Sequence, residues 1–419
     1  MKKVKVIDAI CGAGKSTHIM KVMKNNPEER WMYVSPYLDE VGDGSKQGRI
    51  QREIPELDFK APAKSGGKEV NLRKIIATGA NVAITHNLLL GLDVDTIRIL
   101  EQEGYNVVID ETLDVISKYD GIHRDDIKCL VGHYVLKDEV TGKLSWNYDL
   151  LGDEYNGSFA QVKNMCDLDS LYIHKGTVLI NKLSPKFLEA AKSVTVLTYM
   201  FEGSVMSTWL QMSGIEYEYQ PLDSGRDPEQ IKQSVRENLV ILDTPRAFKK
   251  MNLDPHNRTL QTAFSKSWYQ SNEELLPDIK RTCESTVKLI KRKYTKNTEV
   301  LWTTFKKYEK DIQGNCYTRR MEESPEGDTM TAFVPKNMKA SNEHANCNVC
   351  LYLVNVYPHG DITSYVNTQG YRVDFKALAI SEMVQFIFRA SIRKGEKMYL
   401  VVASDRMKSE LLKWLEKPV

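Results

Sequence analysis

The chain has 419 residues, of which 42% are hydrophobic and 27% are charged, and its formal net charge is +2. This length and composition predict a globular protein of two or three domains. The chain lacks an apolar run near the roughly 18 residues that a membrane span needs, and its overall charge does not indicate nucleic-acid binding. The first apolar stretch, Val6–Cys11, is too short for a secretory signal, so we expect a cytoplasmic protein without a membrane partner.

The first half of the chain alternates short apolar runs with helical stretches. The candidate strands are Val4–Ile7, Trp31–Ser35, Val82–Thr85, Asn106–Asp110, Val194–Thr198 and Ile215–Gln220. Apolar strands that alternate with helices favour a parallel sheet covered on both faces. The pattern breaks at about 121–183, where Tyr134–Lys137 and Lys143–Asn147 flank a Thr-Gly turn. We interpret this region as an insertion that contains a β-hairpin.

The second half repeats the alternation after a polar stretch. That stretch, residues 223–237, has the composition of a linker between a first domain at 1–222 and a second at 238–419. The expected strands are Leu239–Asp243, Glu299–Thr304, Val349–Val354 and Met398–Ala403. The expected helices are Asn272–Tyr294, Asp374–Ile392 and Asp405–Leu415. The predicted fold is therefore α/β, with two tandem domains built on parallel sheets.

Residues 9–17, AICGAGKST, have the composition of a loop that binds phosphates. Glycines let the backbone amides turn toward phosphate oxygens, a lysine reaches the β and γ phosphates, and a hydroxyl binds Mg²⁺. Lys15 and Ser16 take the last two roles. The nucleotide-binding residues that we expect are Gly12, Ala13, Gly14, Lys15, Ser16 and Thr17. The position between a predicted strand and a predicted helix disfavours a chance glycine-rich turn.

The predicted strand at 106–110 ends in an acidic pair, Asp110 and Glu111. The carboxyl ends of parallel strands open onto the ligand crevice, where an aspartate can hold Mg²⁺ through water. The adjacent glutamate can orient and deprotonate an attacking water. Such pairs are also common on protein surfaces, so the phosphate loop upstream is what makes this pair informative.

Residues 381–393, SEMVQFIFRASIR, predict a helix with a polar stripe. Gln385, Arg389 and Arg393 follow one another at intervals of four, which places them along one side of a helix. Arginines in this position can neutralise charge that develops on a γ-phosphate. The alternative is an amphipathic helix with surface arginines.

Two further patterns leave alternatives open. Between Lys280 and Arg320 there are 12 basic and 4 acidic residues, which suits either a track for a phosphate backbone or a solvated helix face. Of the 7 cysteines, only Cys347 and Cys350 form a CxxC pair, which favours reduced structural thiols over a metal site.

Taken in order, these motifs resemble those of superfamily 2 helicases of the DExx type, and in particular the compact DNA helicases of bacteriophages. AICGAGKST resembles motif I, DETL (110–113) motif II and QFIFRASIR (385–393) motif VI. Five shorter segments resemble the remaining motifs by order and spacing: YVSP (33–36), ITHN (84–87), TVLTYMF (195–201), VLWTTFK (300–306) and residues 339–355. DETL is neither DEAD nor DEAH, which separates the chain from DEAD-box proteins.

The resemblance implies two RecA-like domains that use ATP and Mg²⁺ to move along nucleic acid. Mg²⁺ would be held by Ser16 and Asp110, and Thr198 would couple hydrolysis to movement. The nucleic-acid contacts implied by the motifs are Ser35, Pro36, Thr85, His86 and Thr303. The implied partners are single-stranded or partly duplex DNA, with RNA not excluded, and replication or recombination proteins. In motif VI an arginine usually follows the glutamine by seven residues, whereas Arg393 follows Gln385 by eight, so either Arg389 or Arg393 is the candidate finger.

Two other functions share some of these motifs. A DNA-packaging motor also combines a phosphate loop with an acidic pair, but it usually carries a nuclease domain with clustered acids in its second half, which we do not find. An adaptor that binds ATP without turnover is disfavoured by the intact Lys15, Asp110 and Glu111. Thr85 and His86 also suit a strand end followed by a helix cap.

Overall fold

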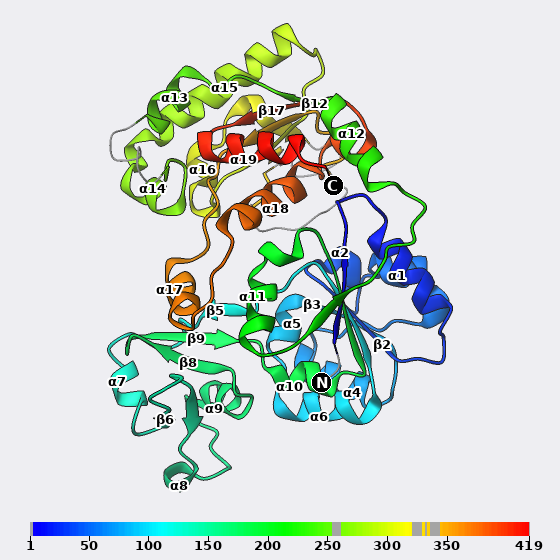
Figure 1. Cartoon of the computed structure of the whole chain (residues 1–419), viewed down its shortest axis with the longest axis vertical. Coiled ribbons are helices and arrows are strands. Elements are labelled where there is room, and N and C mark those ends of the chain that lie inside the picture. The colour runs from blue at the N-terminus through cyan, green and yellow to red at the C-terminus, as the bar shows by residue number, and fades with distance from the viewer. Residues whose placement is uncertain (1–2, 254–260, 321–328, 332, 336–343, 419) are drawn as a thin grey trace. The chain divides into compact units, whose positions relative to one another are not determined.

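The computed structural model describes residues 3–253, 261–320, 329–331, 333–335 and 344–418. The chain forms two compact units (Figure 1). The first comprises Met1–Ala9, Gly14–Ser224 and Pro358–Asp374, and the second comprises Ile10–Ala13, Gly225–Tyr357 and Phe375–Val419. In the described part of the chain, no helix is long and apolar enough to cross a membrane.

The first unit is built on a parallel sheet of six strands in the order β11-β1-β10-β4-β2-β3. The strands are β1 (Val4–Asp8), β2 (Trp31–Ser35), β3 (Val82–Thr85), β4 (Asn106–Asp110), β10 (Ser193–Thr198) and β11 (Tyr217–Tyr219). The central strands are almost wholly buried because apolar residues occupy both of their faces. All six strands that the sequence predicts for this half are therefore present.

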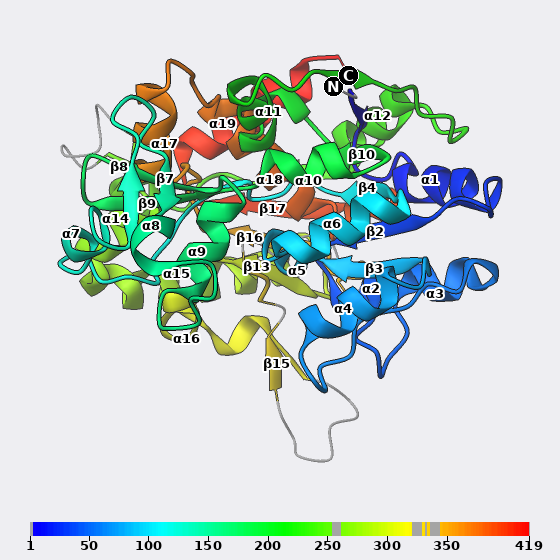
Figure 2. The ribbon, with the colours of Figure 1, turned by 90° about the horizontal axis from the view of Figure 1, so that it is seen from below.

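Helices cover both faces of this sheet (Figures 1 and 2). They are α1 (Lys15–Lys24), α2 (Leu38–Val41), α3 (Arg49–Glu53), α4 (Lys68–Ile76), α5 (His86–Leu90), α6 (Val94–Glu103), α10 (Pro185–Ala190) and α11 (Val205–Met212). On one face, Ile19 and Met23 of α1 pack with Tyr33, Val108 and Leu197 of the strands. This packing fixes the start of α1 against the end of β1.

The insertion forms a small domain of its own within the first unit. Its antiparallel sheet has the order β5-β9-β8, with β5 at Ile116–Lys118, β8 at Leu171–His174 and β9 at Val178–Lys182. The predicted hairpin is confirmed as β6 (Val135–Lys137) and β7 (Leu144–Trp146). The helices are α7 (Ile127–Leu130), α8 (Tyr148–Leu151) and α9 (Ala160–Asp167). Trp146 is buried in the core of this domain, so the hairpin is packed rather than free.

A segment from the second half of the chain completes this small domain. Helix α17 (Gly360–Thr368) belongs to the first unit, although the residues before and after it belong to the second. His174 Nε2 lies 3.0 Å from Ser364 Oγ, and the His174 and Tyr365 rings meet edge to face. Lys182 Nζ lies 3.6 Å from the centroid of the Tyr172 ring, and burial lowers the pKa of this amine to about 8. The sequence did not predict this docking.

The second unit contains a parallel sheet in the order β12-β17-β16-β13. Its strands are β12 (Leu239–Ile241), β13 (Val300–Thr303), β16 (Val349–Tyr352) and β17 (Met398–Val402). A separate hairpin pairs β14 (Thr318–Arg320) with β15 (Thr329–Thr331). The helices are α12 (Pro228–Asn238), α13 (Arg246–Asn252), α14 (Lys266–Ser271), α15 (Leu276–Lys293), α16 (Glu309–Ile312), α18 (Phe375–Ile387) and α19 (Asp405–Glu416). The expected α/β class with two parallel sheets is thus confirmed.

Two local predictions differ from the structure. The stretch 223–237, expected as a linker, contains α12, because Asp227 caps its N-terminus and Pro228 occupies a first-turn position that tolerates proline. The helix expected at Asp374–Ile392 ends at Ile387. After Ile387 the Arg389 and Ala390 N–H groups bond three residues back instead of four. The Ser391 N–H bonds to the Cys347 carbonyl, 2.9 Å away.

The basic stretch maps largely onto α15 and the segment after it. Ile279, Cys283, Val287 and Ile290 form the buried stripe of α15, so its basic side chains lie on the opposite, exposed face. The side chains of residues 319 and 320, and residues 339–343 of the segment that resembles motif V, lie outside the described part of the chain.

Candidate nucleotide-binding site

The strand order of the first unit brings three of the sequence motifs to one edge of its sheet. Asp8, at the end of β1, is in register with Thr198 of β10, and Leu197 of β10 is in register with Asp110 of β4. The phosphate loop follows β1 and the acidic pair spans the end of β4, with β10 alone between them. Loop, acids and Thr198 therefore meet at the carboxyl edge, where open α/β sheets bind ligands.

The phosphate loop adopts a backbone that glycine makes accessible. Gly12 and Gly14 have φ values of 84° and 89°, in the left-handed region that strains residues with a side chain. Gly14 is also the N-cap of α1, so Lys15, Ser16 and Thr17 form the first turn of that helix. Their N–H groups have no intrahelical acceptor, and with the helix dipole they favour an anion at this point. The local geometry therefore fits phosphate oxygens.

Lys15 is only 8% exposed, and its ammonium donates a hydrogen bond to the Ala9 carbonyl oxygen, 2.7 Å away. The lysine thus lies back across its own loop. A phosphate group would offer this ammonium a charged acceptor, which makes a stronger hydrogen bond than a neutral carbonyl.

Two residues that the sequence did not assign to this role hold Asp110 in place. The Tyr33 hydroxyl donates to Asp110 Oδ2 at 2.9 Å. Burial and the Asp110 charge raise the pKa of Tyr33 well above its usual value, so the hydroxyl keeps its proton and remains a donor. His86 Nε2 lies 2.9 Å from the Asp110 carbonyl oxygen, which can only accept, so this nitrogen carries the proton. Asp110 is therefore oriented from β2 and from the start of α5.

Glu111 has a left-handed backbone, with φ 67°, while its N–H donates to the Leu197 carbonyl at 2.8 Å. A residue with a side chain adopts this conformation at a cost of roughly 1–2 kcal/mol. The hydrogen bond to β10 sustains this conformation, and the left-handed backbone ends the strand immediately after Asp110. Strained residues of this kind cluster at functional sites.

Asp8 is a further acid at this edge that the sequence analysis missed. Its two carboxylate oxygens accept hydrogen bonds from the backbone N–H groups of Met200 and Phe201, each at 2.8 Å. Burial raises the pKa of Asp8, while these two bonds and the charge of Lys15 oppose the rise. The available signal was an acid at the end of an apolar strand directly before the phosphate loop.

The residues expected to contact nucleic acid occupy varied environments. Ser35 and Thr85 are neighbours at the ends of β2 and β3, but Ser35 is fully buried. The Thr85 hydroxyl accepts from the Leu88 N–H at 3.4 Å and caps α5, which is the alternative role that the sequence left open. His86 is buried and bonded to Asp110 as described, and Pro36 is half-buried. In the second unit, Thr303 ends β13 and is fully buried.

The sequence predicted that the three polar residues of the arginine segment lie along one side of a helix. The structure shows that this prediction is wrong, because only one of the three lies on α18. Gln385 lies on α18, where its Nε2 donates to Ser381 Oγ at 3.3 Å. Arg389 follows the end of the helix, is 2% exposed and lies 5.1 Å from the centroid of the Phe386 ring. Arg393 is exposed on the 3₁₀ helix η7 (Ser391–Lys394). The early helix end therefore gives the two arginines different environments.

Few protein side chains at this edge are available to coordinate a metal ion. The described residues contain no group of three or more His, Cys, Asp or Glu side chains that could enclose an ion. The hydroxyl of Ser16 and the carboxylate of Asp110 are oxygen donors, which Mg²⁺ prefers, and Mg²⁺ commonly completes its shell with water and phosphate oxygens. The donor chemistry therefore fits Mg²⁺ bound together with a nucleotide.

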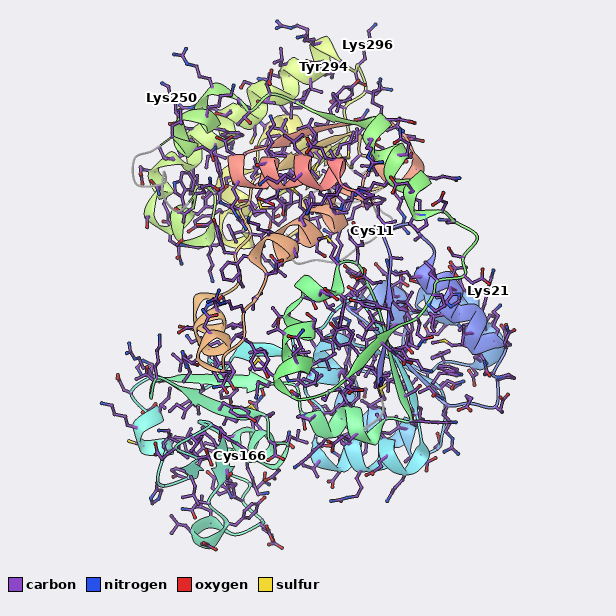
Figure 3. All side chains as sticks on the ribbon, in the orientation of Figure 1. Cys11, Lys21, Cys166, Lys250, Tyr294 and Lys296 are labelled. Atoms are coloured by element: carbon purple, nitrogen blue, oxygen red, sulfur yellow. The ribbon has the colours of Figure 1, made fainter. Side chains whose placement is uncertain are left out.

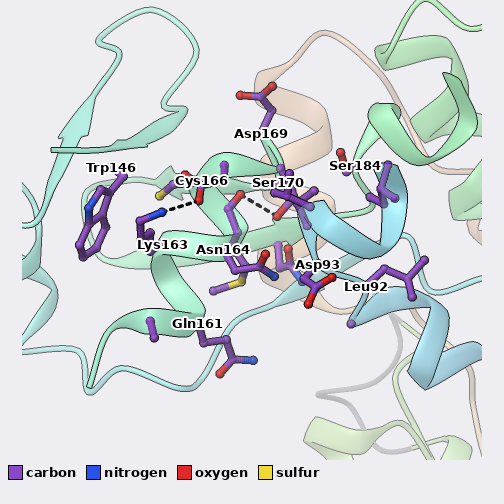
Figure 4. A pocket seen from close by; sticks show the side chains of 18 of the residues that line it. Leu92, Asp93, Trp146, Gln161, Lys163, Asn164, Cys166, Asp169, Ser170 and Ser184 are labelled. Atoms are coloured by element: carbon purple, nitrogen blue, oxygen red, sulfur yellow. Dashed lines mark hydrogen bonds and ion pairs between the residues drawn. The ribbon is translucent and has the colours of Figure 1, made fainter. Parts of the chain in front are cut away.

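A cavity of about 1150 Å³ lies elsewhere in the first unit, between the α5–α6 connection and α9 (Figure 4). Several of its charged groups belong to ion pairs. Asp93 pairs with Arg73, and Lys163 lies 2.9 Å from Asp167. The cavity lies between the insertion and the main sheet, and its lining carries more acidic than basic side chains.

The chain is similar to a curated protein over nearly its whole length. This relative is the "SPbeta prophage-derived uncharacterized protein YonV" of Bacillus subtilis (strain 168), 29% identical over 429 residues that cover 99% of each chain. Residues 116–181 match the family model of the YonV middle domain, and residues 244–415 match that of the YonV C-terminal Rossmann-like domain. The first match coincides with the small domain inserted after β4.

Several solved helicase structures align with the chain over nearly its whole length. "XPD_Helicase" covers 100% of this chain and 96% of its own, with 11% identity and a TM-score of 0.42. "Structure of S. tokodaii Xpd4" covers 99% and 94%, with 12% identity and a TM-score of 0.49. The DUF1998 helicase MrfA bound to DNA and AMPPNP covers 100% and 49%, with 12% identity and a TM-score of 0.33. Likenesses this distant carry no information about the chemistry.

Proposed function

We propose that this chain is a magnesium-dependent ATPase of the helicase or translocase type. The observation that supports it best is the shared sheet edge, where the phosphate loop and the Asp110–Glu111 pair flank the end of β10. This edge combines groups that bind phosphates with groups that activate water. The resemblance of the motif series to superfamily 2 helicases supports the choice of a motor over other ATPases.

In the proposed reaction, Lys15 exchanges its bond to the Ala9 carbonyl for the β and γ phosphates of ATP, and the first turn of α1 supplies N–H donors. Bound Mg²⁺ would neutralise phosphate charge, with Ser16 and Asp110 holding it. Glu111 orients the attacking water and takes up its proton. Tyr33 orients the carboxylate of Asp110, and His86 holds its backbone carbonyl.

Arg389 and Arg393 are the candidates for the group that neutralises charge on the γ-phosphate. Arg393 is the stronger candidate, because its side chain is exposed, whereas Arg389 is buried. Gln385, half-buried on α18, would assist from the same segment.

The proposed track is DNA, single-stranded or partly duplex. Support comes from the motif resemblance, from the exposed basic face of α15 and from the prophage origin of the YonV relative. We also propose a phage role in replication, recombination or repair, for which the prophage origin of the same relative is the support. Ser35, Pro36, Thr85, His86 and Thr303 are the proposed contact positions; for the buried ones, contact requires a local rearrangement.

The decisive experiment measures steady-state ATP hydrolysis with Mg²⁺ and no polynucleotide, single-stranded DNA, duplex DNA or RNA. Lys15→Ala should abolish hydrolysis, because the substitution removes the ammonium proposed to bind the phosphates. Lys21→Ala, at an exposed lysine on the same helix (Figure 3), should behave as wild type and serves as the matched control.

Strong stimulation by one nucleic acid, lost in Lys15→Ala, would establish a coupled motor and identify its track. A Lys15-dependent rate without stimulation would favour a packaging-type ATPase whose partner is a protein. Nucleotide binding without turnover under every condition would favour the adaptor.

A further inference from the structure

The residue just before the phosphate loop is bonded to the segment that follows β10. Asp8 uses one carboxylate oxygen for the Met200 N–H and the other for the Phe201 N–H, both at 2.8 Å. Phe201 begins the short helix η2 (Phe201–Gly203) and is fully buried. Two bonds from a charged acceptor to consecutive N–H groups fix the position and the orientation of this turn.

The turn that Asp8 holds is conformationally unfavourable by itself. Met200 has φ 59°, a left-handed conformation that residues with a side chain seldom adopt. Hydrogen bonds to the charged carboxylate offset this unfavourable backbone energy. The conformation of the turn therefore depends on Asp8. If the carboxylate were lost or displaced, the segment would relax toward a different backbone.

Ala9, the residue directly after β1, contacts the lysine proposed to bind the phosphates. Lys15 Nζ donates to the Ala9 carbonyl at 2.7 Å, and the Ala9 N–H donates to the Thr198 carbonyl at 3.0 Å. Lys15 is also close enough to affect Asp8, since its positive charge acts against the rise in the pKa of that carboxyl. Phosphates that draw Lys15 away from Ala9 would therefore change both the hydrogen bonding and the electric field beside Asp8.

We propose that Asp8 is a positioning residue that couples the phosphate loop to residues 199–203, so that nucleotide bound at Lys15 alters the conformation of this turn. The inference rests on the proposed function and extends it, because it names a physical connection between nucleotide binding and the segment after Thr198. A cap that only stabilises the fold would make the same hydrogen bonds, so the test must separate coupling from stability.

Asp8→Asn is the most informative substitution. Asparagine has the shape of aspartate but offers one acceptor and one N–H₂ donor, so at least one of the two backbone N–H groups loses its acceptor. Asp93→Asn is the matched control for the loss of a carboxylate charge, because Asp93 also caps a backbone N–H, that of Thr96 on α6 in the same unit, and its second oxygen pairs with Arg73. Thermal unfolding of both variants shows whether each is folded.

The readout is the ratio of stimulated to unstimulated ATP hydrolysis. We expect this ratio to fall about tenfold or more in Asp8→Asn, the size of effect expected from losing hydrogen bonds to a charged group, and to stay unchanged in Asp93→Asn. If both rates fell in parallel in Asp8→Asn, Asp8 would be a structural cap and the inference would be wrong. Should Asp8→Asn fail to fold, Asp8→Glu, which retains the charge but shifts both oxygens, carries the same comparison.

Hydrogen exchange separates this inference from the proposed function. Addition of a non-hydrolysable ATP analogue with Mg²⁺ should change the amide exchange of residues 199–203 in the wild type and in Asp93→Asn, but not in Asp8→Asn or Lys15→Ala. If the wild-type segment does not respond, the inference fails, whatever the ATPase data show. A response without stimulation by any nucleic acid would leave the coupling intact and reject the motor.

Discussion

The phosphate loop and the arginine segment differ in how their geometry is determined. Gly12, Gly14 and Lys15 take their positions from local backbone preferences and from the start of α1. The arginine segment instead follows the end of the helix at Ile387 and is held by a distant partner, because the Ser391 N–H bonds to the Cys347 carbonyl. The conformation of a motif can be predicted from sequence where local backbone preferences determine it. Where a contact with a distant residue determines the conformation, the sequence indicates which residues are present but not how they are arranged.

The largest loss of hydrolysis is expected from a substitution of Glu111, at the same sheet edge as the phosphate loop. Glu111→Gln keeps the size of the side chain and removes the proposed base, so hydrolysis should fall about a thousandfold, within the range of general-base effects. Binding of a fluorescent ATP analogue should remain near the wild-type level. Hydrolysis within a few-fold of wild type would contradict the role of Glu111, and loss of nucleotide binding would point to a structural role at the end of β4.

The next effect distinguishes the two arginines. Arg393→Ala should slow hydrolysis about a hundredfold with little change in the melting temperature, because Arg393 is exposed. Arg389→Ala should mainly lower the stability of the protein, by roughly 2–4 kcal/mol, because it leaves a space in a buried environment.

The neighbouring exposed cation Lys394 supplies the control, since Lys394→Ala should affect neither property. A slow but fully stable Arg389→Ala, together with an active Arg393→Ala, would assign the finger to Arg389 instead.

The smallest effect is expected at Tyr33. Tyr33→Phe removes only the hydroxyl that donates to Asp110, so hydrolysis at saturating Mg²⁺ should fall about fivefold, in line with the loss of one hydrogen bond. The Mg²⁺ concentration that gives half-maximal activity should rise, because Asp110 is less well oriented. Tyr105→Phe, which removes a buried hydroxyl bonded to the Ala80 carbonyl in the same unit, is the control. An unchanged Mg²⁺ dependence in Tyr33→Phe would separate this hydrogen bond from metal binding.

The sequence predicted much of the scaffold, for physical reasons that the structure makes plain. The strands of both parallel sheets are short apolar runs, and α15 has a regular buried stripe, so their periodicity is visible in the chain itself. The roles of Asp8 and Tyr33 could not be predicted, because each depends on a partner from another strand or turn. The docking of α17 was invisible for the same reason, since its partner strands lie far away in the sequence.

That docking also governs how the protein can be divided. A fragment that ends near Ser224 would lack α17 and leave one side of the β5-β9-β8 sheet, with Tyr172, His174 and Lys182, without its cover. The complementary fragment would carry α17 with no surface to fold against. Independent expression of the two halves should therefore yield poorly soluble pieces, and co-expression should restore them by fragment complementation. Recombination that replaces one half of the gene without the other would likewise separate α17 from the strands that it packs against.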